Sequence, residues 1–150
     1  MAITADDLRD LPAHLPDWIR THLEQYVGSG GAEGEDWQGV KTLLLKTLGR
    51  KSGRPLVLPL IYGRDPEGDG YVIVASKGGA PAHPAWYLNL DAAPTVEVQV
   101  GTEQFTATAR TVDDAERERL WPLMAAIWPP YDDYQKATDR KIPVVVLTPD

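Results

Sequence analysis

A series of short strand-like runs separated by tight turns constrains this fold more than any other feature of the sequence. Val40–Leu48 and Leu56–Tyr62 are the first two runs, and the segment from Gly49 to Gly53 between them predicts a hairpin turn. Pro59 favours an edge strand or a bulge for the second run, because proline has no N–H to donate to a neighbouring strand. The remaining runs are Tyr71–Ala75, Thr95–Val100, Phe105–Thr111 and Ile142–Leu147. Six short strands, mostly linked by hairpins, predict a small β-barrel.

Three helices are expected to decorate this barrel. Leu15–Val27 has an apolar stripe at helical spacing and ends at Gly28. Pro84–Leu90 predicts a short helix, and a capping pattern predicts a third helix over Asp113–Ile127, which Pro122 is expected to break or kink. Strands and helices do not alternate as in a doubly wound sheet, and neither a Rossmann fingerprint nor a phosphate-loop motif is present. The predicted fold class is therefore mainly β with helices, α+β.

A glycine-rich stretch divides the first helix from the first strand. Residues 28–36 include four glycines and predict a flexible linker. We therefore expect an N-terminal helical segment with its linker over residues 1–36 and a barrel domain over residues 37–150. The helix is expected to pack on the barrel, and the alternatives are that it covers a site or touches a membrane surface.

The composition argues against several classes of function. Cysteine is absent and the three histidines are far apart, so the sequence predicts no metal site. The net charge of −7 argues against nucleic-acid binding, which needs a dominant basic field. No run reaches the roughly 18–20 apolar residues of a membrane span, and the acidic start is unlike a secretory signal. A cytoplasmic location is predicted.

The positive charge of the chain is unevenly distributed. Between Trp37 and Arg64 there is no Asp or Glu, but there are six cations: Lys41, Lys46, Arg50, Lys51, Arg54 and Arg64. In a chain that is acidic overall, this stretch indicates a site for an anion. A solvated pair of strands is the alternative interpretation.

Two glycine-marked basic segments have the features that an anion site needs. In Thr47–Arg54, glycines allow successive backbone N–H groups to converge, and the cations at Arg50, Lys51 and Arg54 add full charges. Ser76–Gly79 combines a hydroxyl, a cation and two glycines between a strand and a helix start. For the first segment, a basic hairpin turn without a ligand is the alternative.

An aromatic cluster near the C-terminus indicates a pocket for a planar molecule. Trp128–Tyr134 places three rings beside two prolines and two acids, a composition that suits a rigid rim. The hydroxyls of Tyr131 and Tyr134 are able to orient or protonate a bound acceptor. Trp86 is expected either to flank a ring or to fill the core. Packing of the rings at a helix entry is the alternative, and no Ser–His–Asp arrangement supports a hydrolytic mechanism.

Taken in order, these motifs resemble the deazaflavin-dependent nitroreductases, a family of flavin and deazaflavin oxidoreductases of actinobacteria. The resemblance extends from Thr42 to Pro149. Its motifs are Gly49–Gly53, Ala75–Gly79, Pro84–Leu90, Val96–Val98, Tyr131–Tyr134 and Thr138–Arg140. Several motifs in the same order are more specific than any one of them.

The resemblance implies a split β-barrel of the FMN-binding, pyridoxamine phosphate oxidase-like type, whose barrel domain binds coenzyme F420. This deazaflavin carries a phosphate and an oligoglutamate tail, so the acid-free basic stretch would meet an extended polyanion. The implied cofactor-binding residues are Arg50, Lys51, Ser52, Gly53, Arg54, Pro59, Tyr62, Ala75, Ser76, Lys77, Gly78, Gly79, Trp86 and Asn89. The implied acceptor pocket contains Trp128, Tyr131 and Tyr134, with the two tyrosines as candidate catalytic residues.

The implied activity is hydride transfer from reduced deazaflavin to an electron-poor acceptor such as a quinone, a nitroaromatic compound or an unsaturated lactone. Tyr131, Tyr134 or solvent would supply the proton. Two alternatives stay open: an FMN-dependent reductase on the same barrel, and a non-catalytic protein that binds F420 or an apolar ligand. A homodimer follows by analogy, and the first helix raises the question of contact with the inner face of the membrane.

Overall fold

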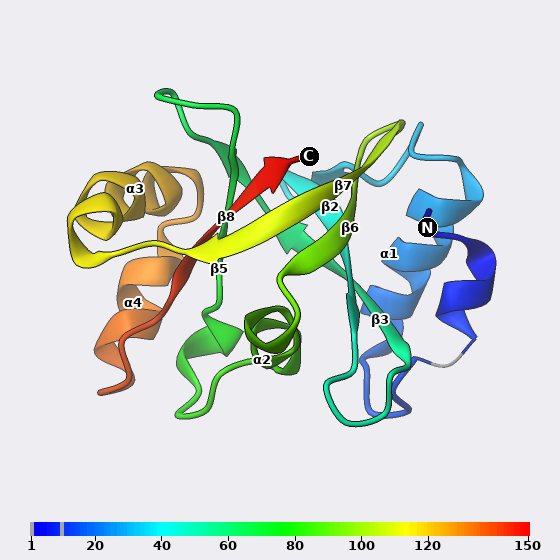
Figure 1. Ribbon diagram of the computed structural model, residues 1–150, viewed down its shortest axis with the longest axis horizontal. Helices are drawn as coiled ribbons and strands as arrows, with labels where there is room; N and C mark the ends of the chain where they lie inside the picture. Colours follow the sequence, from blue (N-terminus) through cyan, green and yellow to red (C-terminus); the bar gives the residue numbers. More distant parts are fainter. Residues whose placement is uncertain (1, 10) are drawn as a thin grey trace.

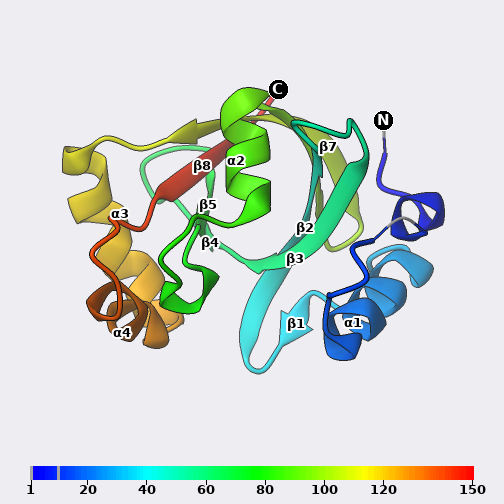
Figure 2. The same ribbon diagram turned by 90° about the horizontal axis from the view of Figure 1, so that it is seen from below.

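The computed structural model describes residues 2–9 and 11–150, which form a curled antiparallel sheet with helices around it (Figures 1 and 2). The strands are β1 (Asp36–Trp37), β2 (Val40–Leu48), β3 (Pro55–Ile61), β4 (Gly63–Arg64), β5 (Tyr71–Val74), β6 (Thr95–Val100), β7 (Glu103–Thr111) and β8 (Val144–Pro149). The helices are η1 (Ala5–Leu8), α1 (Asp17–Gly28), η2 (Lys77–Gly79), α2 (Ala85–Ala92), α3 (Asp114–Ile127) and α4 (Pro130–Lys136).

The sheet curls into a barrel because one bent segment, β3 followed by β4, pairs with β2 near one end of the sheet and with β5 near the other end. The strand order is β1-β2-β6-β7-β8-β5-β4, and β3 lies on the other side of β2. Only Tyr62 separates β3 from β4, so this segment pairs first with β2 and then with β5. The β4–β5 pairing ends at Gly63 opposite Val72. Past that point, within the described part of the chain, β3 pairs with β2 alone, which leaves a split between β3 and β5. Pro59 therefore lies in an edge strand, as predicted.

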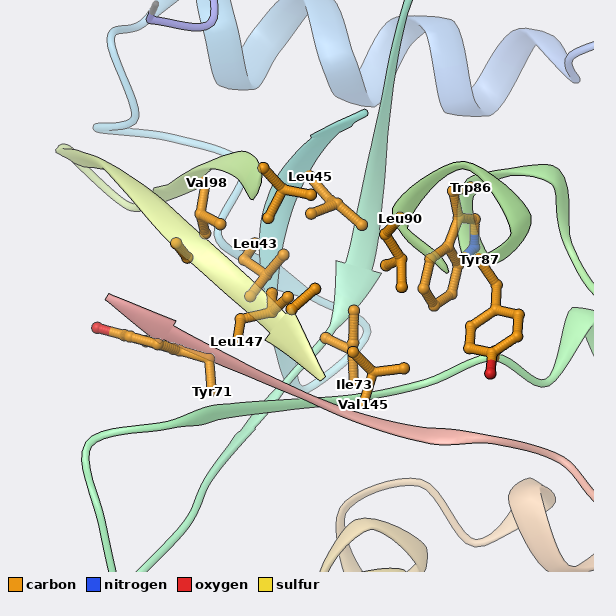
Figure 3. Packing of buried hydrophobic residues seen from close by; sticks show 14 residues of the cluster. Leu43, Leu45, Tyr71, Ile73, Trp86, Tyr87, Leu90, Val98, Val145 and Leu147 are labelled. Carbon is orange, nitrogen blue, oxygen red and sulfur yellow. The ribbon is translucent and has the colours of Figure 1, made fainter. Parts of the chain in front are cut away.

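Inward-facing side chains of the strands form the core of the barrel (Figure 3). They alternate along each strand, since successive side chains of a strand point to opposite faces. Helix α2 adds two aromatic rings and a leucine to the same cluster. The labelled members are Leu43, Leu45, Tyr71, Ile73, Trp86, Tyr87, Leu90, Val98, Val145 and Leu147. The core thus occupies the barrel interior and leaves the split beside it free for a site.

Helix α1 packs on the outer face of β2 and β3, on the right in Figure 1. Its Leu23 and Tyr26 are fully buried together with Leu44 of β2 and Val57 of β3. The expected amphipathic helix is thus present, shifted by one or two residues, and its apolar stripe faces the barrel. Packing on the barrel was the favoured of the three predicted placements, and the structure confirms it.

The hydroxyl of Tyr26 joins α1 to the barrel by hydrogen bonds. It donates to the carbonyl of Thr42 at 2.9 Å and accepts from the backbone N–H of Gly101 at 2.9 Å. Burial raises the pKa of Tyr26 to about 12, so the donor proton is retained. The expected boundary between residues 36 and 37 falls inside β1, which pairs with β2. The division into an N-terminal segment and a barrel domain stays a prediction.

Helices α3 and α4 lie at the opposite side of the sheet from α1 in both views. The predicted cap is present, because the Asp113 side chain accepts from the N–H of Glu116 at 2.9 Å. Of the break or kink expected at Pro122, the break is wrong, since α3 continues through the proline to Ile127. Leu120 and Met124, both fully buried, hold the helix on either side of the proline.

Two further elements differ from the sequence prediction. The aromatic segment, for which a rigid rim or packing at a helix entry is expected, forms the short helix α4. Pro130 lies in its first turn, where the missing N–H costs nothing, and acids follow it. The closing strand begins at Val144 and not at Ile142.

Candidate active site

A pocket of about 300 Å³ opens at the split between β3 and β5. The two strands supply its floor, and the loop after β5 supplies one edge. The residues of this part are Pro59, Leu60, Ile61, Val74, Ser76 and Gly78. The pocket exists because the bent segment stops pairing with β5, so backbone separation and not side-chain size creates the space.

Aromatic rings form the remaining walls of this split pocket. Helix α4 contributes Tyr131 and Tyr134, whose rings lie 6.2 Å apart edge to face, and Trp128 precedes the helix. The Trp128 ring lies 5.6 Å from that of Trp37. Burial raises the pKa of Tyr131, which makes its phenol a weak acid near neutral pH. The walls therefore suit a flat, apolar ring.

The loop at the edge of the pocket has an unusual backbone that the fold holds in place. Lys77, Gly78 and Gly79 have φ angles of +46°, +61° and +81°. A Cβ at Gly79 would lie 2.7 Å from the carbonyl oxygen of Tyr134, so only glycine allows the loop to approach α4 this closely. Ser76 is right-handed and Lys77 is left-handed, the succession that forms an anion-binding nest of backbone N–H groups, whereas the N–H of Gly79 donates to the carbonyl of Ser76 at 2.9 Å.

Arg140 stabilises this loop through hydrogen bonds to its backbone carbonyls. Its guanidinium donates to the carbonyls of Ala75 at 3.1 Å, Ser76 at 2.7 Å and Ala80 at 3.0 Å. It also bonds Nδ1 of His83 at 3.0 Å, and since arginine only donates, Nδ1 accepts. Burial and the nearby guanidinium lower the pKa of His83, so the imidazole stays neutral. Arg140 thus determines the shape of the loop.

A second pocket, of about 350 Å³, lies at the β2–β3 turn. It is lined by Pro12, Gly49, Arg50, Lys51, Ser52, Arg54, Pro55, Leu56, Ala85 and Asn89. Buried Asn89 shapes the turn, because its side-chain oxygen accepts from the backbone N–H and guanidinium of Arg50, at 3.2 and 3.1 Å. Its amide donates to the hydroxyl of Thr47 at 3.1 Å. Three cations are thereby presented on one exposed turn.

The charges of the acid-free stretch separate into two groups in the structure. Lys46 is buried and pairs with Asp7 at 3.1 Å, and Lys41 pairs with Asp36 at 2.6 Å. Over residues 2–9 and 11–150, no such carboxylate partner is found for the three cations of the turn pocket, Arg50, Lys51 and Arg54. Only part of the predicted basic stretch is therefore available to an external anion.

The two pockets lie along the same strand. Pro55 and Leu56 of β3 line the turn pocket, and Pro59, Leu60 and Ile61 of β3 line the split pocket. Pro59 lies three positions after Leu56 in the extended strand, which corresponds to about 10 Å. A single extended ligand is able to place a planar group in the split and an anionic end at the turn.

The structure brings most of the expected residues to these two pockets. The turn pocket includes Arg50, Lys51, Ser52, Arg54 and Asn89, and the split pocket includes Pro59, Ser76, Gly78, Trp128, Tyr131 and Tyr134. Other expected residues lie outside both lining sets: Gly53, Tyr62, Ala75, Lys77, Gly79 and Trp86. Trp86 and Ala75 are buried in the barrel core, and the Tyr62 hydroxyl donates to Glu35 at 2.7 Å.

Three aromatic residues of the split pocket, all from the N-terminal α1–β1 region, were not identified from the sequence. Trp18 and His22 of α1 and Trp37 of β1 reach it from the N-terminal segment. Their rings form a stack, with 5.5 Å between Trp18 and Trp37 and 6.5 Å between His22 and Trp37. The i, i+4 spacing of Trp18 and His22 was the available signal, because such residues share one face of a helix.

Solved structures place the chain in a fold class. A pyridoxamine 5′-phosphate oxidase-like protein from Listeria innocua aligns with a TM-score of 0.51 at 13% identity, over 85% of this chain and 94% of that chain. At this identity the likeness concerns the fold alone. The protein is thus a split β-barrel of the pyridoxamine phosphate oxidase-like class, as expected.

Closer matches give the family. The family model described as F420H(2)-dependent quinone reductase matches residues 18–149. A Mycobacterium tuberculosis protein named F420H(2)-dependent quinone reductase is 45% identical over 134 residues, 87% of this chain and 89% of the relative. The structure of the F420-H2 dependent reductase FDR-A has a TM-score of 0.64 at 44% identity, covering 71% of this chain and 92% of that chain. The chain belongs to the F420H(2)-dependent quinone reductase family, which confirms the predicted relation to deazaflavin-dependent oxidoreductases.

A further relative bears on assembly. A chain solved as a domain-swapped dimer has a TM-score of 0.67 at 40% identity, over 87% of this chain and 97% of that chain.

Within the described residues, no helix is long and apolar enough to cross a membrane, and no group of acidic, histidine or cysteine side chains is arranged to hold a metal ion.

Proposed function

We propose that this protein binds coenzyme F420 across its two pockets and uses the reduced form to reduce quinones. The observation that carries the proposal is a turn of three cations without carboxylate partners among the described residues, on the same strand as an aromatic pocket. The parts of F420 match the two pockets, since its planar ring is followed by a phosphate and an anionic tail. The family membership supports the same cofactor and acceptor class.

In this proposal each pocket has a separate task. Lys51 and Arg54 attract the anionic tail, while Arg50, fixed by Asn89, provides a pre-oriented donor. The left-handed loop around Gly78 offers N–H groups to the phosphate. Bound reduced F420 supplies the hydride, and the protein contributes proximity and exclusion of water. Tyr134 and Tyr131 hold the acceptor ring against the split.

Loss of the turn cations is expected to weaken cofactor binding specifically. The variant Lys51→Ala/Arg54→Ala leaves the Arg50–Asn89 contact intact and removes two charges. We expect the Kd for F420, measured by its fluorescence, to rise about 10- to 100-fold and to depend less on salt. Arg110→Ala/Lys141→Ala is the matched control, because it removes two cations on β7 and before β8, where both pair with acids. Absence of saturable binding by the unaltered protein at micromolar concentrations would refute F420 as the cofactor.

The same preparation distinguishes the alternatives. An FMN-dependent reductase would purify with flavin absorbance and would not respond to loss of the tail-binding cations. A non-catalytic binder would take up F420 but would not oxidise F420H2 when menadione is added. Quinone-dependent oxidation of F420H2 with salt-sensitive F420 binding is the result that we expect.

Self-association is a further part of the proposal. The relative solved as a domain-swapped dimer supports a homodimer for this chain, and light scattering after gel filtration measures its mass directly. Contact of α1 with a membrane has weaker support, because the apolar stripe of the helix is used against β2 and β3. Vesicle sedimentation of the full chain with and without residues 1–36 tests that contact.

A further inference from the structure

His22 lies at the split pocket although it belongs to the N-terminal helix. Its ring lines the pocket, lies parallel to the ring of Trp37 and is 92% shielded from solvent, with 8% of its surface exposed. Its neighbours in the wall are Trp18, Thr42 and the rings of α4. A titratable side chain therefore forms part of the site at which the acceptor is expected to bind.

One nitrogen of this imidazole is fixed and the other is unused. Nε2 lies 2.7 Å from the carbonyl oxygen of Gly34. A carbonyl only accepts, so Nε2 carries a hydrogen in either charge state of the ring. Nδ1 is buried and has no hydrogen-bond partner among the described residues. Buried polar atoms without partners are uncommon, and this one belongs to a side chain that lines the split pocket.

Quinone reduction needs a proton donor, and Nδ1 of His22 is a candidate for this role. Conversion of a quinone to a hydroquinone takes one hydride and one proton. Tyr131 is poorly suited to supply the proton, because burial raises its pKa. Histidine is the side chain that most readily changes charge near neutral pH. With Nε2 fixed by Gly34, Nδ1 is the position at which this ring gains and loses its proton.

We propose that His22 is the proton donor to the quinone, acting through Nδ1. This proposal rests on the proposed function and adds the source of the second hydrogen. As the hydride of the reduced cofactor reaches the quinone, the Nδ1–H bond of the imidazolium breaks and an O–H bond forms on the quinone oxygen. The products are the hydroquinone, the oxidised cofactor and a neutral His22, which takes a new proton from solvent. Each turnover thus transfers one hydride and one proton.

The titratable and charged groups that face His22 come from three elements. From α1 it faces Tyr26, whose raised pKa keeps it neutral. From β1, Asp36 lines a further small cavity together with His22 and is paired with Lys41. From α4, Tyr131 and Tyr134 share the wall of the split pocket.

The test compares His22→Gln with His14→Gln, an identical replacement at an exposed position of the same segment. We expect His22→Gln to lower kcat with menadione about 100-fold, as for loss of a general acid. The Kd for F420 should stay within about 2-fold of the original value, since the turn pocket is unchanged. A general acid must carry its proton, so kcat of the original protein should fall toward high pH, and this fall should be absent in His22→Gln. His14→Gln should retain both the rate and the profile.

A second measurement needs neither turnover nor a variant. Histidine labelled with 15N reports the tautomer and charge of each ring by NMR in the cofactor-free protein. Adding menadione should perturb Nδ1 of His22 while Nε2 keeps its proton, and His14 should not respond. An unchanged pH profile in a folded His22→Gln variant overturns the proposal, and so does a His22 signal that ignores menadione. If the protein fails to oxidise F420H2 with any quinone, the proposed function fails, and the NMR result still decides whether His22 contacts a quinone.

Discussion

Gly31 shows how one residue determines where the N-terminal segment meets the barrel. Its φ angle is +91°, and its N–H donates to the carbonyl of Tyr26 at 2.9 Å. An added Cβ would lie 1.7 Å from the carbonyl oxygen of Gly101, in the β6–β7 turn. The neighbouring Gly30 has a φ angle of +65°, but a Cβ there would meet nothing within 4 Å. Both positions therefore need a left-handed backbone, but only Gly31 also needs the absence of a side chain for close packing.

Replacing each glycine by alanine should have clearly different costs. Gly30→Ala is expected to lower the free energy of unfolding by about 1 kcal/mol, the cost of a left-handed residue with a side chain. Gly31→Ala should cost about 3 kcal/mol or more, because the β6–β7 turn must also move. Urea denaturation followed by tryptophan fluorescence measures both values. Equal costs for the two replacements would contradict the close approach at Gly101.

Residues with local requirements were predictable from the sequence, whereas their partners were not. The glycines of the Ser76–Gly79 loop and the cap at Asp113 were identified because their conformation depends on neighbours in the chain. Lys46 was counted with the anion-binding cations, but it pairs with Asp7, 39 residues away. Such pairing depends on the packing of η1 against β3, and no local pattern encodes it.

At the level of elements, the α3 helix is joined to the β4–β5 turn by an ion pair. Asp65 accepts two hydrogen bonds from the guanidinium of Arg119, at 2.7 and 3.0 Å. This contact, assisted by the backbone N–H of Glu67, lowers the pKa of Asp65 to about 2. Because the folded-state pKa lies below the unfolded value of about 4, the carboxylate stabilises the fold above pH 4. That contribution is lost as the pH falls from about 4 to about 2.

The difference between the original protein and Asp65→Asn should follow this pH dependence. We expect the variant to have a Tm lower by about 1–3 °C at pH 7, because a solvent-screened ion pair contributes little. The difference should shrink toward pH 2, where Asp65 is protonated in the unfolded state and about half protonated in the folded state. Thermal unfolding followed by circular dichroism at several pH values measures it. A difference that stays constant down to pH 2 would mean that the ion pair is not its cause.

Strands and capped helices were predicted well because their signals are periodic, while helix interruptions were not. Pro122 removes one hydrogen bond from α3, and burial of Leu120 and Met124 outweighs that loss. For the segment of α4 the sequence left a rigid rim and packing at a helix entry open, because prolines and acids suit both. The i, i+3 spacing of Tyr131 and Tyr134, which places both rings on one face, was the overlooked indication.

At the level of the whole molecule, the site depends on three parts of the chain that are far apart in the sequence. The split pocket combines the barrel strands, α4 and the N-terminal α1–β1 region. The sequence indicated that the barrel strands and the segment of α4 belong to the site. It predicted the α1 helix but left open whether that helix covers a site. The contribution of Trp18 and His22 follows from the way in which α1 lies on β2 and β3, which is a tertiary feature.

This arrangement predicts that cofactor and acceptor protect different segments from hydrogen exchange. F420 alone should slow exchange mainly in the β2–β3 turn around Lys51 and in the loop after β5, because these line its proposed path. Menadione should slow exchange in α1 from Trp18 to His22 and at Trp37, since these residues line the split pocket and not the turn pocket. Mass spectrometry of peptides from the cofactor-free protein, the F420 complex and the menadione complex separates the effects. Uniform protection by either ligand, or an α1 that ignores menadione, would show that the N-terminal helix packs on the barrel without forming a wall of the acceptor site.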